Sequence, residues 1–191
     1  MLFARRTAAY ALIGVLSSVL ATARAAGFIE GVPPLILGKL SSSEEVRGVF
    51  TETKVTPDKK EYVTKGVFHI RPGTDFEWKT TDPFETRFYA TPEKYVYSNE
   101  DETVSRPLAE LPRFSRLETL MKKDFSVFFK LFNALYAEEN GIFHIKAKPK
   151  AGELAKFLEC VEADGTTTDW TLGVHLVNGT LFRIRFQENA K

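Results

Sequence analysis

Short segments in which apolar and polar residues alternate fill the chain between residues 47 and 97. In the clearest of them Phe76, Trp78 and Thr80 are separated by charged residues, so one side of the segment is apolar. Such alternation predicts β-strands with one buried face, and the Pro- and Gly-containing stretches between the segments predict tight turns. We therefore expect an antiparallel meander. Its strands are predicted over residues 49–55, 62–71, 76–80, 84–88 and 95–97.

The same alternation returns toward the C-terminus. Two further strands are predicted over residues 142–148 and 154–163. Beyond them, residues 170–176 and 182–186 alternate strictly on either side of Asn178-Gly179, a dipeptide that favours a type I′ turn. The sequence therefore predicts a C-terminal β-hairpin, which is its strongest local signal.

The middle of the chain has a different period. Between Pro112 and Asn140 the apolar residues recur at spacings of three and four, which predicts helix. Asp124 fits an N-cap that divides this segment into two helices, and Asn140-Gly141 fits a C-terminal stop. The second predicted helix is strongly aromatic on one side, through Phe125, Phe128, Phe129 and Phe132. A short N-terminal helix is also expected over residues 26–43.

The first 25 residues have the organisation of a secretory signal peptide. Arg5-Arg6 precede an apolar run from Ala8 to Leu20, and Ala23-Arg24-Ala25 supplies small residues for cleavage. The apolar run is about 13 residues long, shorter than the roughly 20 that a membrane-spanning helix needs. We expect Sec-type export to the periplasm and a single mature domain over residues 26–191.

Composition excludes several classes of function. Without the leader, 23 Lys and Arg residues stand against 25 Asp and Glu, a net charge of −2 that gives no indication of nucleic-acid binding. The three histidines lie on separate predicted strands, so no metal site is expected. No phosphate loop, dinucleotide fingerprint or nucleophile elbow occurs, so neither cofactor nor catalysis is expected. Cys160 is the only candidate nucleophile, and its apolar neighbours favour a buried packing role.

The 16 phenylalanines leave two interpretations of the interior open. In the first, the central helices cover the apolar face of the sheet and complete an ordinary core. In the second, a curved sheet and the same helices enclose a space that admits a lipid. The pattern alone favours the first.

Two segments resemble the outer-membrane lipoprotein carrier (LolA-like) family. They are Val49–Lys54, similar to the first strand of that family, and Gly66–Gly73 with the Phe76-Glu77-Trp78 and Pro83-Phe84 that follow it. The resemblance implies an α+β, mainly β fold: an incomplete, strongly curved antiparallel β-barrel with helices forming a lid over a hydrophobic cavity. The segment after Arg106-Pro107 departs from the family pattern and leaves the cargo open.

The resemblance also implies a function. Family members carry acylated lipoproteins across the periplasm, from an inner-membrane ABC-type transporter to an outer-membrane acceptor, and a monomer is expected. Arg71, in the Arg-Pro motif, is expected to latch the lid. An envelope lipid sensor with the same curved sheet is the alternative function, and a lipid hydrolase is a third. The residues expected to line the cavity are Phe68, Ile70, Phe76, Trp78, Phe84, Phe88, Trp170, Leu172 and Val174 on the sheet and Phe125, Phe128, Phe129 and Phe132 on the lid, although alternation leaves the face of Phe68 and Ile70 open.

Overall fold

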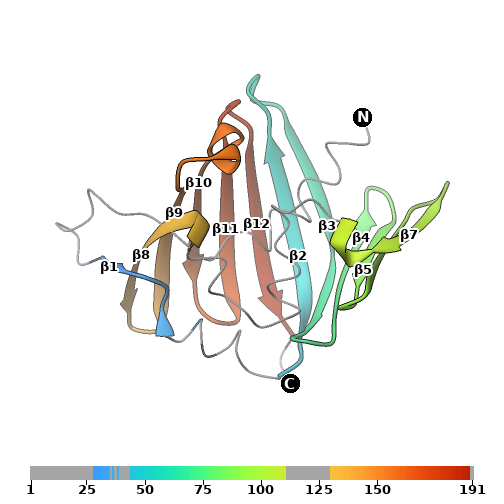
Figure 1. The fold of residues 1–191 in the computed structure, drawn as a ribbon, viewed down its shortest axis with the longest axis horizontal. Coiled ribbons are helices and arrows are strands. Elements are labelled where there is room, and N and C mark those ends of the chain that lie inside the picture. The colour runs from blue at the N-terminus through green and yellow to red at the C-terminus, as the bar shows by residue number, and fades with distance from the viewer. Residues whose placement is uncertain (1–27, 35, 37, 39–43, 111–129, 190–191) are drawn as a thin grey trace.

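A computed structural model describes residues 28–34, 36, 38, 44–110 and 130–189. These residues form one antiparallel sheet of twelve strands (Figure 1). In chain order the strands are β1 (Ile29–Glu30), β2 (Val46–Val55), β3 (Glu61–Arg71), β4 (Asp75–Asp82), β5 (Thr86–Ala90), β6 (Lys94–Ser98), β7 (Thr103–Pro107), β8 (Phe132–Glu139), β9 (Ile142–Pro149), β10 (Leu158–Gly165), β11 (Asp169–Leu176) and β12 (Leu181–Glu188). Two short 3-10 helices accompany them, η2 (Leu108–Glu110) and η4 (Glu153–Lys156).

The sheet consists of two meanders that meet at its centre. The order of strands is β1-β8-β9-β10-β11-β12-β2-β3-β4-β5-β6-β7. Strands β2 to β7 follow one another in sequence, as do β8 to β12, and the pairing of β12 with β2 joins the two sets (Figure 1). Because β1 and β7 are the two edges of this order, the sheet is open. The expected open antiparallel sheet, mainly β, is therefore confirmed.

The C-terminal hairpin is confirmed, but its predicted type I′ turn is wrong. The backbone N–H of Leu176 donates to the carbonyl of Thr180, and the N–H of Gly179 donates to the carbonyl of Leu176. Gly179 has a φ of +81°, whereas Asn178 is not among the described non-glycine residues with positive φ. A type I′ turn needs positive φ at both central residues, so this is a three-residue loop with glycine in the left-handed position.

The helical prediction for residues 112–140 is wrong in its last part. Lys130 and Leu131 are helical, but β8 begins at Phe132 and pairs with β9 over eight residue pairs. The spacing that suggested a helix is overridden because cross-strand pairing with β9 satisfies the backbone and buries Phe132 against the rest of the sheet. The remainder of the expected lid, including Phe125, Phe128 and Phe129, lies outside the described residues.

The expected N-terminal helix over residues 26–43 is also only partly right. Ile29–Glu30 forms β1 and pairs with β8, while Pro34, Ile36 and Gly38 are helical. Besides β8, two strands were not predicted, β1 and β7, and both are short edge strands. In the part of the chain with described coordinates, no helix is long and apolar enough to cross a membrane.

One face of the sheet is apolar and buried, and we call it the inner face. Along β9, β12 and β4 every second side chain is buried, as the alternation predicts. The buried apolar side chains of these and neighbouring strands form one continuous core cluster. The opposite, outer face carries ion pairs such as Lys146 with Glu162 and Arg185 with Asp169.

Gly66 lets β3 approach β4 closely and leaves space for an aromatic ring on the inner face. A Cβ atom at this position would lie 2.1 Å from the carbonyl oxygen of Lys79 and 2.6 Å from the ring of Phe50. The space that Gly66 leaves is therefore filled by Phe50, whose ring stacks on Trp78 with centroids 3.7 Å apart. The pairing of β3 with β4 also shifts register between Lys65 and Gly66, which fits the local bend that strand glycines allow.

Replacing Gly66 with alanine should therefore destabilise the fold. We expect the G66A substitution to lower the free energy of unfolding by about 2 kcal/mol or more, because an overpacked core strains its neighbours. Urea denaturation measures this change. The control is G173A, since a Cβ at Gly173 would meet only ordinary van der Waals contacts, the nearest atom being 3.5 Å away. Equal stability of G66A and G173A would show that the packing of the Phe50 ring does not require glycine at position 66.

Candidate functional site

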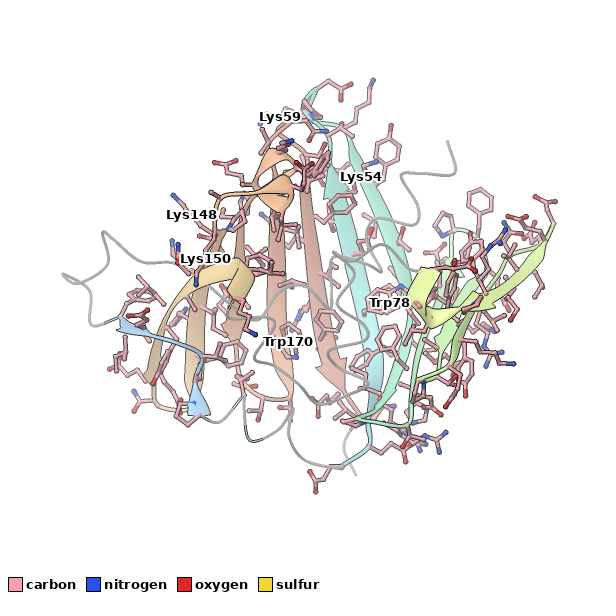
Figure 2. The ribbon with its side chains drawn as sticks, viewed as in Figure 1. Lys54, Lys59, Trp78, Lys148, Lys150 and Trp170 are labelled. Carbon is pink, nitrogen blue, oxygen red and sulfur yellow. The ribbon has the colours of Figure 1, made fainter. Side chains whose placement is uncertain are left out.

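Aromatic rings cover the inner face across most of its width. On the central strands, Trp170 stacks on Phe186 with centroids 4.3 Å apart, and Phe186 lies 5.9 Å from Trp78. Trp78 and Trp170, labelled in Figure 2, come from the two different meanders. Further ring contacts extend this surface to both sides, through Phe143 with Trp170, Phe68 with Phe186, Phe76 with Phe88, and Phe88 with Tyr95.

These ring contacts show that the inner face is concave. Phe186 lies on β12 and Trp78 on β4, three strands away in the sheet. Strands in a flat sheet are about 4.8 Å apart, so this separation corresponds to roughly 14 Å. The two ring centroids are only 5.9 Å apart. The side chains therefore converge over the centre of the sheet, as they do on the inside of a curved one.

Cross-strand register divides the centre of the inner face into three levels. The aromatic level contains Trp170, Phe186 and Phe50, with Gly66 beside them. The next, which we call the carboxyl level, contains Leu172, Ile184, Glu52 and Thr64. The last, the rim level, contains Val174, Phe182, Lys54 and Tyr62 and lies toward the hairpin that joins β2 to β3. The inner face therefore becomes more polar toward one end of β2.

Glu52 places a carboxyl group within this apolar surface. Its side chain is buried, with 8% of the residue exposed, between Ile184 and Thr64 on the neighbouring strands. Burial raises the pKa of Glu52 from 4.5 to about 7, and the positive charge of Lys54 lowers it only in part. No hydrogen bond or ion pair joins Glu52 to another residue within the described ranges. The carboxyl group is thus held close to the point of protonation at neutral pH.

Lys54 lies two residues further along β2, nearer the hairpin (Figure 2). Its amine is 5.7 Å from the centre of the buried ring of Phe182, a separation at which a cation is attracted to an aromatic face. Beside it, Tyr62 is 55% exposed. The rim level therefore combines a cation and aromatic surface at the border with solvent.

Arg71 is bonded within its own hairpin. Its guanidinium donates two hydrogen bonds to the carboxylate of Asp75, which is only 3% exposed and also accepts a hydrogen bond of 3.4 Å from the Tyr89 hydroxyl. The bond from Arg71 holds the pKa of Asp75 below its ordinary value. Cross-strand register places this pair on the outer face, opposite Phe76. The lid that Arg71 was expected to latch lies outside the described residues.

The other predicted site residues are distributed unevenly. Phe68 and Ile70, whose face was open, belong to the inner face, because Phe68 pairs with Trp78 and Ile70 with Phe76. Phe84 is 50% exposed in the connection between β4 and β5. The remaining predicted residues with described coordinates lie on the inner face: Phe76, Trp78, Phe88, Phe132, Trp170, Leu172 and Val174. Their contact with a lipid stays a prediction.

Sequence reasoning missed several residues of the same surface. Phe182, Ile184 and Phe186 follow from the hairpin itself, since strands paired in a hairpin share their faces. Phe50, Glu52 and Lys54 become part of the site only through the pairing of β2 with β12. No local signal in the sequence gives that pairing.

Cys160 does not have the surroundings of a nucleophile. It lies opposite His175 across β10 and β11, but the His175 imidazole is 3.6 Å from Glu162. Burial and the nearby carboxylates raise the pKa of the Cys160 thiol, whereas reactive cysteines have lowered pKa values. The described residues also contain no group of three or more side chains that could hold a metal ion.

Comparison with solved structures gives likenesses of fold. The fold is similar to the crystal structure of a LolA superfamily protein from Nitrosomonas europaea, with 7% sequence identity and a TM-score of 0.41, over 82% of this chain and 93% of that chain. No family model matches the sequence, and no curated protein does. A likeness at this level assigns neither a family nor a function.

The buried carboxyl of Glu52 should make stability depend on pH. Since its pKa is higher in the folded protein, the folded state holds the proton more tightly, and stability falls as pH rises from about 4.5 to about 7. A shift of this size corresponds to roughly 3 kcal/mol. The side chain of E52Q has no proton to lose, so we expect E52Q not to lose stability in this way. The free energy of unfolding of E52Q minus that of the wild type should therefore increase by about 3 kcal/mol between pH 4.5 and pH 8.

Urea denaturation across this pH range measures the difference. The matched control is E61Q, which changes an exposed carboxyl near the start of β3 and should follow the wild type. If E52Q and E61Q show the same pH dependence, the carboxyl of Glu52 is not buried in solution.

Proposed function

We propose that this protein is a non-catalytic lipid carrier that binds acyl chains against its inner face. The observation that carries the proposal is the continuous, concave aromatic surface that runs from Phe143 on β9 to Tyr95 on β6. Apolar sites with a few placed polar groups are the usual form of small-molecule binding sites. The carboxyl of Glu52 is buried without an ion-pair partner among the described residues, and an apolar residue in its place would cost less to bury. Its presence therefore favours a binding surface rather than an ordinary core.

The size of the hydrophobic effect fits a carrier that must also release its cargo. Burial of an acyl chain contributes about 0.8 kcal/mol per CH₂ group, so a chain of about sixteen carbons gains roughly 12 kcal/mol if it is fully enclosed. That is the range of nanomolar affinity before the costs of binding are subtracted. An open sheet encloses a chain only in part, which lowers the affinity and allows transfer to a stronger acceptor.

The finer parts of the proposal rest on the sequence. The N-terminal segment supports export to the periplasm, where acylated lipoproteins are the proposed cargo. An inner-membrane ABC-type transporter would supply the cargo and an outer-membrane acceptor would receive it. We propose that the carrier acts as a monomer.

The two tryptophans provide a direct test, because both lie on the inner face and the chain contains no others. A lysophospholipid with a brominated acyl chain should quench the emission of both, since bromine quenches indole on contact. We expect a loss of at least about half of the emission, and no loss with the unbrominated lipid. The single-tryptophan variants W78F and W170F separate the contributions of the two halves of the sheet.

Circular dichroism of each variant shows whether the sheet remains folded. Folded protein whose emission does not respond to the brominated lipid, at concentrations below its micelle threshold, would contradict the proposal. Quenching of only one tryptophan would still support binding and would restrict the chain to one meander.

A further inference from the structure

The described residues contain two buried carboxyl groups, and their surroundings differ. Asp75, on the outer face, accepts hydrogen bonds from Arg71 and Tyr89. Glu52, on the inner face, has no such partner among the residues described, although it is buried to a similar degree. Buried charged groups in proteins are normally paired. The acceptor oxygens of Glu52 are therefore available to a group that does not belong to the described sheet.

The neighbours of Glu52 define the chemistry that would satisfy it. Thr64 lies beside it on β3 and Ile184 on β12. Lys54 lies on the same face of the same strand. Its positive charge lowers the pKa of Glu52, although the two side chains do not form an ion pair. An acceptor in the interior and a donor at the rim are thus placed in sequence along β2.

The order of these residues along β2 sets the orientation of a bound acyl chain. The aromatic level at Phe50 lies four residues from Lys54 along the strand, a distance of roughly 13 Å in extended backbone. A chain whose polar end lay beside Lys54 and Glu52 would extend across the aromatic level. The reverse orientation would place the polar end among the rings of Phe50, Trp78 and Phe186, away from both charged side chains.

We propose that Glu52 and Lys54 form a head-group site, which selects acylated molecules whose polar end carries a hydrogen-bond donor, such as an amide N–H or a hydroxyl, next to an acceptor. The donor bonds the carboxylate of Glu52 and the acceptor receives a hydrogen bond from the amine of Lys54. This inference rests on the proposed function and adds the class and the orientation of the cargo. Hydrogen bonds to charged groups are stronger than neutral ones, so the selection is expected to be large.

Two ligands of equal chain length test the site. An N-acylethanolamine carries an amide N–H and a hydroxyl, whereas the methyl ester of the same fatty acid carries no donor. We expect the full-length or signal-cleaved wild-type protein to bind the first at least about tenfold more tightly, which corresponds to 1.4 kcal/mol. Tryptophan fluorescence titration measures both dissociation constants.

Three variants assign the selection to its residues. E52M replaces the carboxyl with an apolar side chain of similar length, so it should keep the fold, lose the preference and bind the methyl ester more tightly. K54M should weaken both ligands, because each carries a carbonyl oxygen that accepts from the amine, and should leave the preference between them nearly unchanged. E61M, altered at an exposed residue with a register position on the outer face, should keep the wild-type preference.

The dependence on pH distinguishes a bond to the carboxylate from a change in packing. Among the described residues, the titratable groups that face Glu52 are Lys54 on β2 and Tyr62 on β3, and the residues of β12 at these levels are Ile184 and Phe182. The preference for the donor-bearing ligand should be greater at pH 8.5 than at pH 5.5, and E52M should show no such change.

The outcomes separate the two proposals. If wild type binds both ligands with equal affinity, the head-group site is wrong and the carrier function stands. If E52M keeps the wild-type preference, Glu52 is not the acceptor and the inference is overturned. If neither ligand binds to folded protein, the carrier function itself is contradicted.

Discussion

The pairing of β12 with β2 is the interaction on which the rest of the structure depends. It runs over eight residue pairs, from Leu181 opposite Val55 to Glu188 opposite Gly48, and is the strand pairing that joins the two meanders. This pairing places Phe186 beside Phe50 and Ile184 beside Glu52. Without it there would be two smaller sheets, each with an apolar face and an unpaired edge. With this pairing, the inner face is continuous over both meanders, and the candidate site lies where β12 and β2 meet.

Curvature follows from how this junction is packed. A Cβ on Gly48 would lie 2.0 Å from the carbonyl oxygen of Gln187, and a Cβ on Gly66 would overlap the ring of Phe50. Both glycines lie in β2 or β3, beside the junction, and permit the close approach that the converging rings require. The large aromatic side chains then fill the concave side. The same residues that stabilise the fold thus form the surface proposed to bind the acyl chain.

Glu52 shows the cost of such a surface. A carboxyl with a pKa raised to about 7 by burial weakens the fold at neutral pH. Proteins keep such groups where they serve a function, and perturbed ionisable groups are enriched at binding and catalytic sites. The polarity of the inner face, aromatic at one level and charged toward the rim, matches the polarity of an amphipathic molecule.

Sequence reasoning recovered the elements whose alternation is local. Strands β2 to β5 and the C-terminal hairpin were predictable because each carries one buried face. β6 has no fully buried residue and was recognised from the alternation of Tyr95 and Tyr97. β8 was not predictable, since Phe132 and Leu135 continue a helical spacing and only pairing with β9 decides otherwise. β7 gave no signal because Thr103–Pro107 is almost entirely exposed. On β2, apolar Val49 and Phe50 point to opposite faces, so Glu52 could be assigned to the inner face only from its partners across the sheet.

The claim that the inner face binds acyl chains is tested most directly by native mass spectrometry of the protein purified gently from its own compartment, with organic extraction of whatever accompanies it. The account predicts discrete adducts whose masses are those of acylated molecules with a polar, donor-bearing end. A single bare mass, unchanged after incubation with phospholipid or acylated peptide, would contradict it.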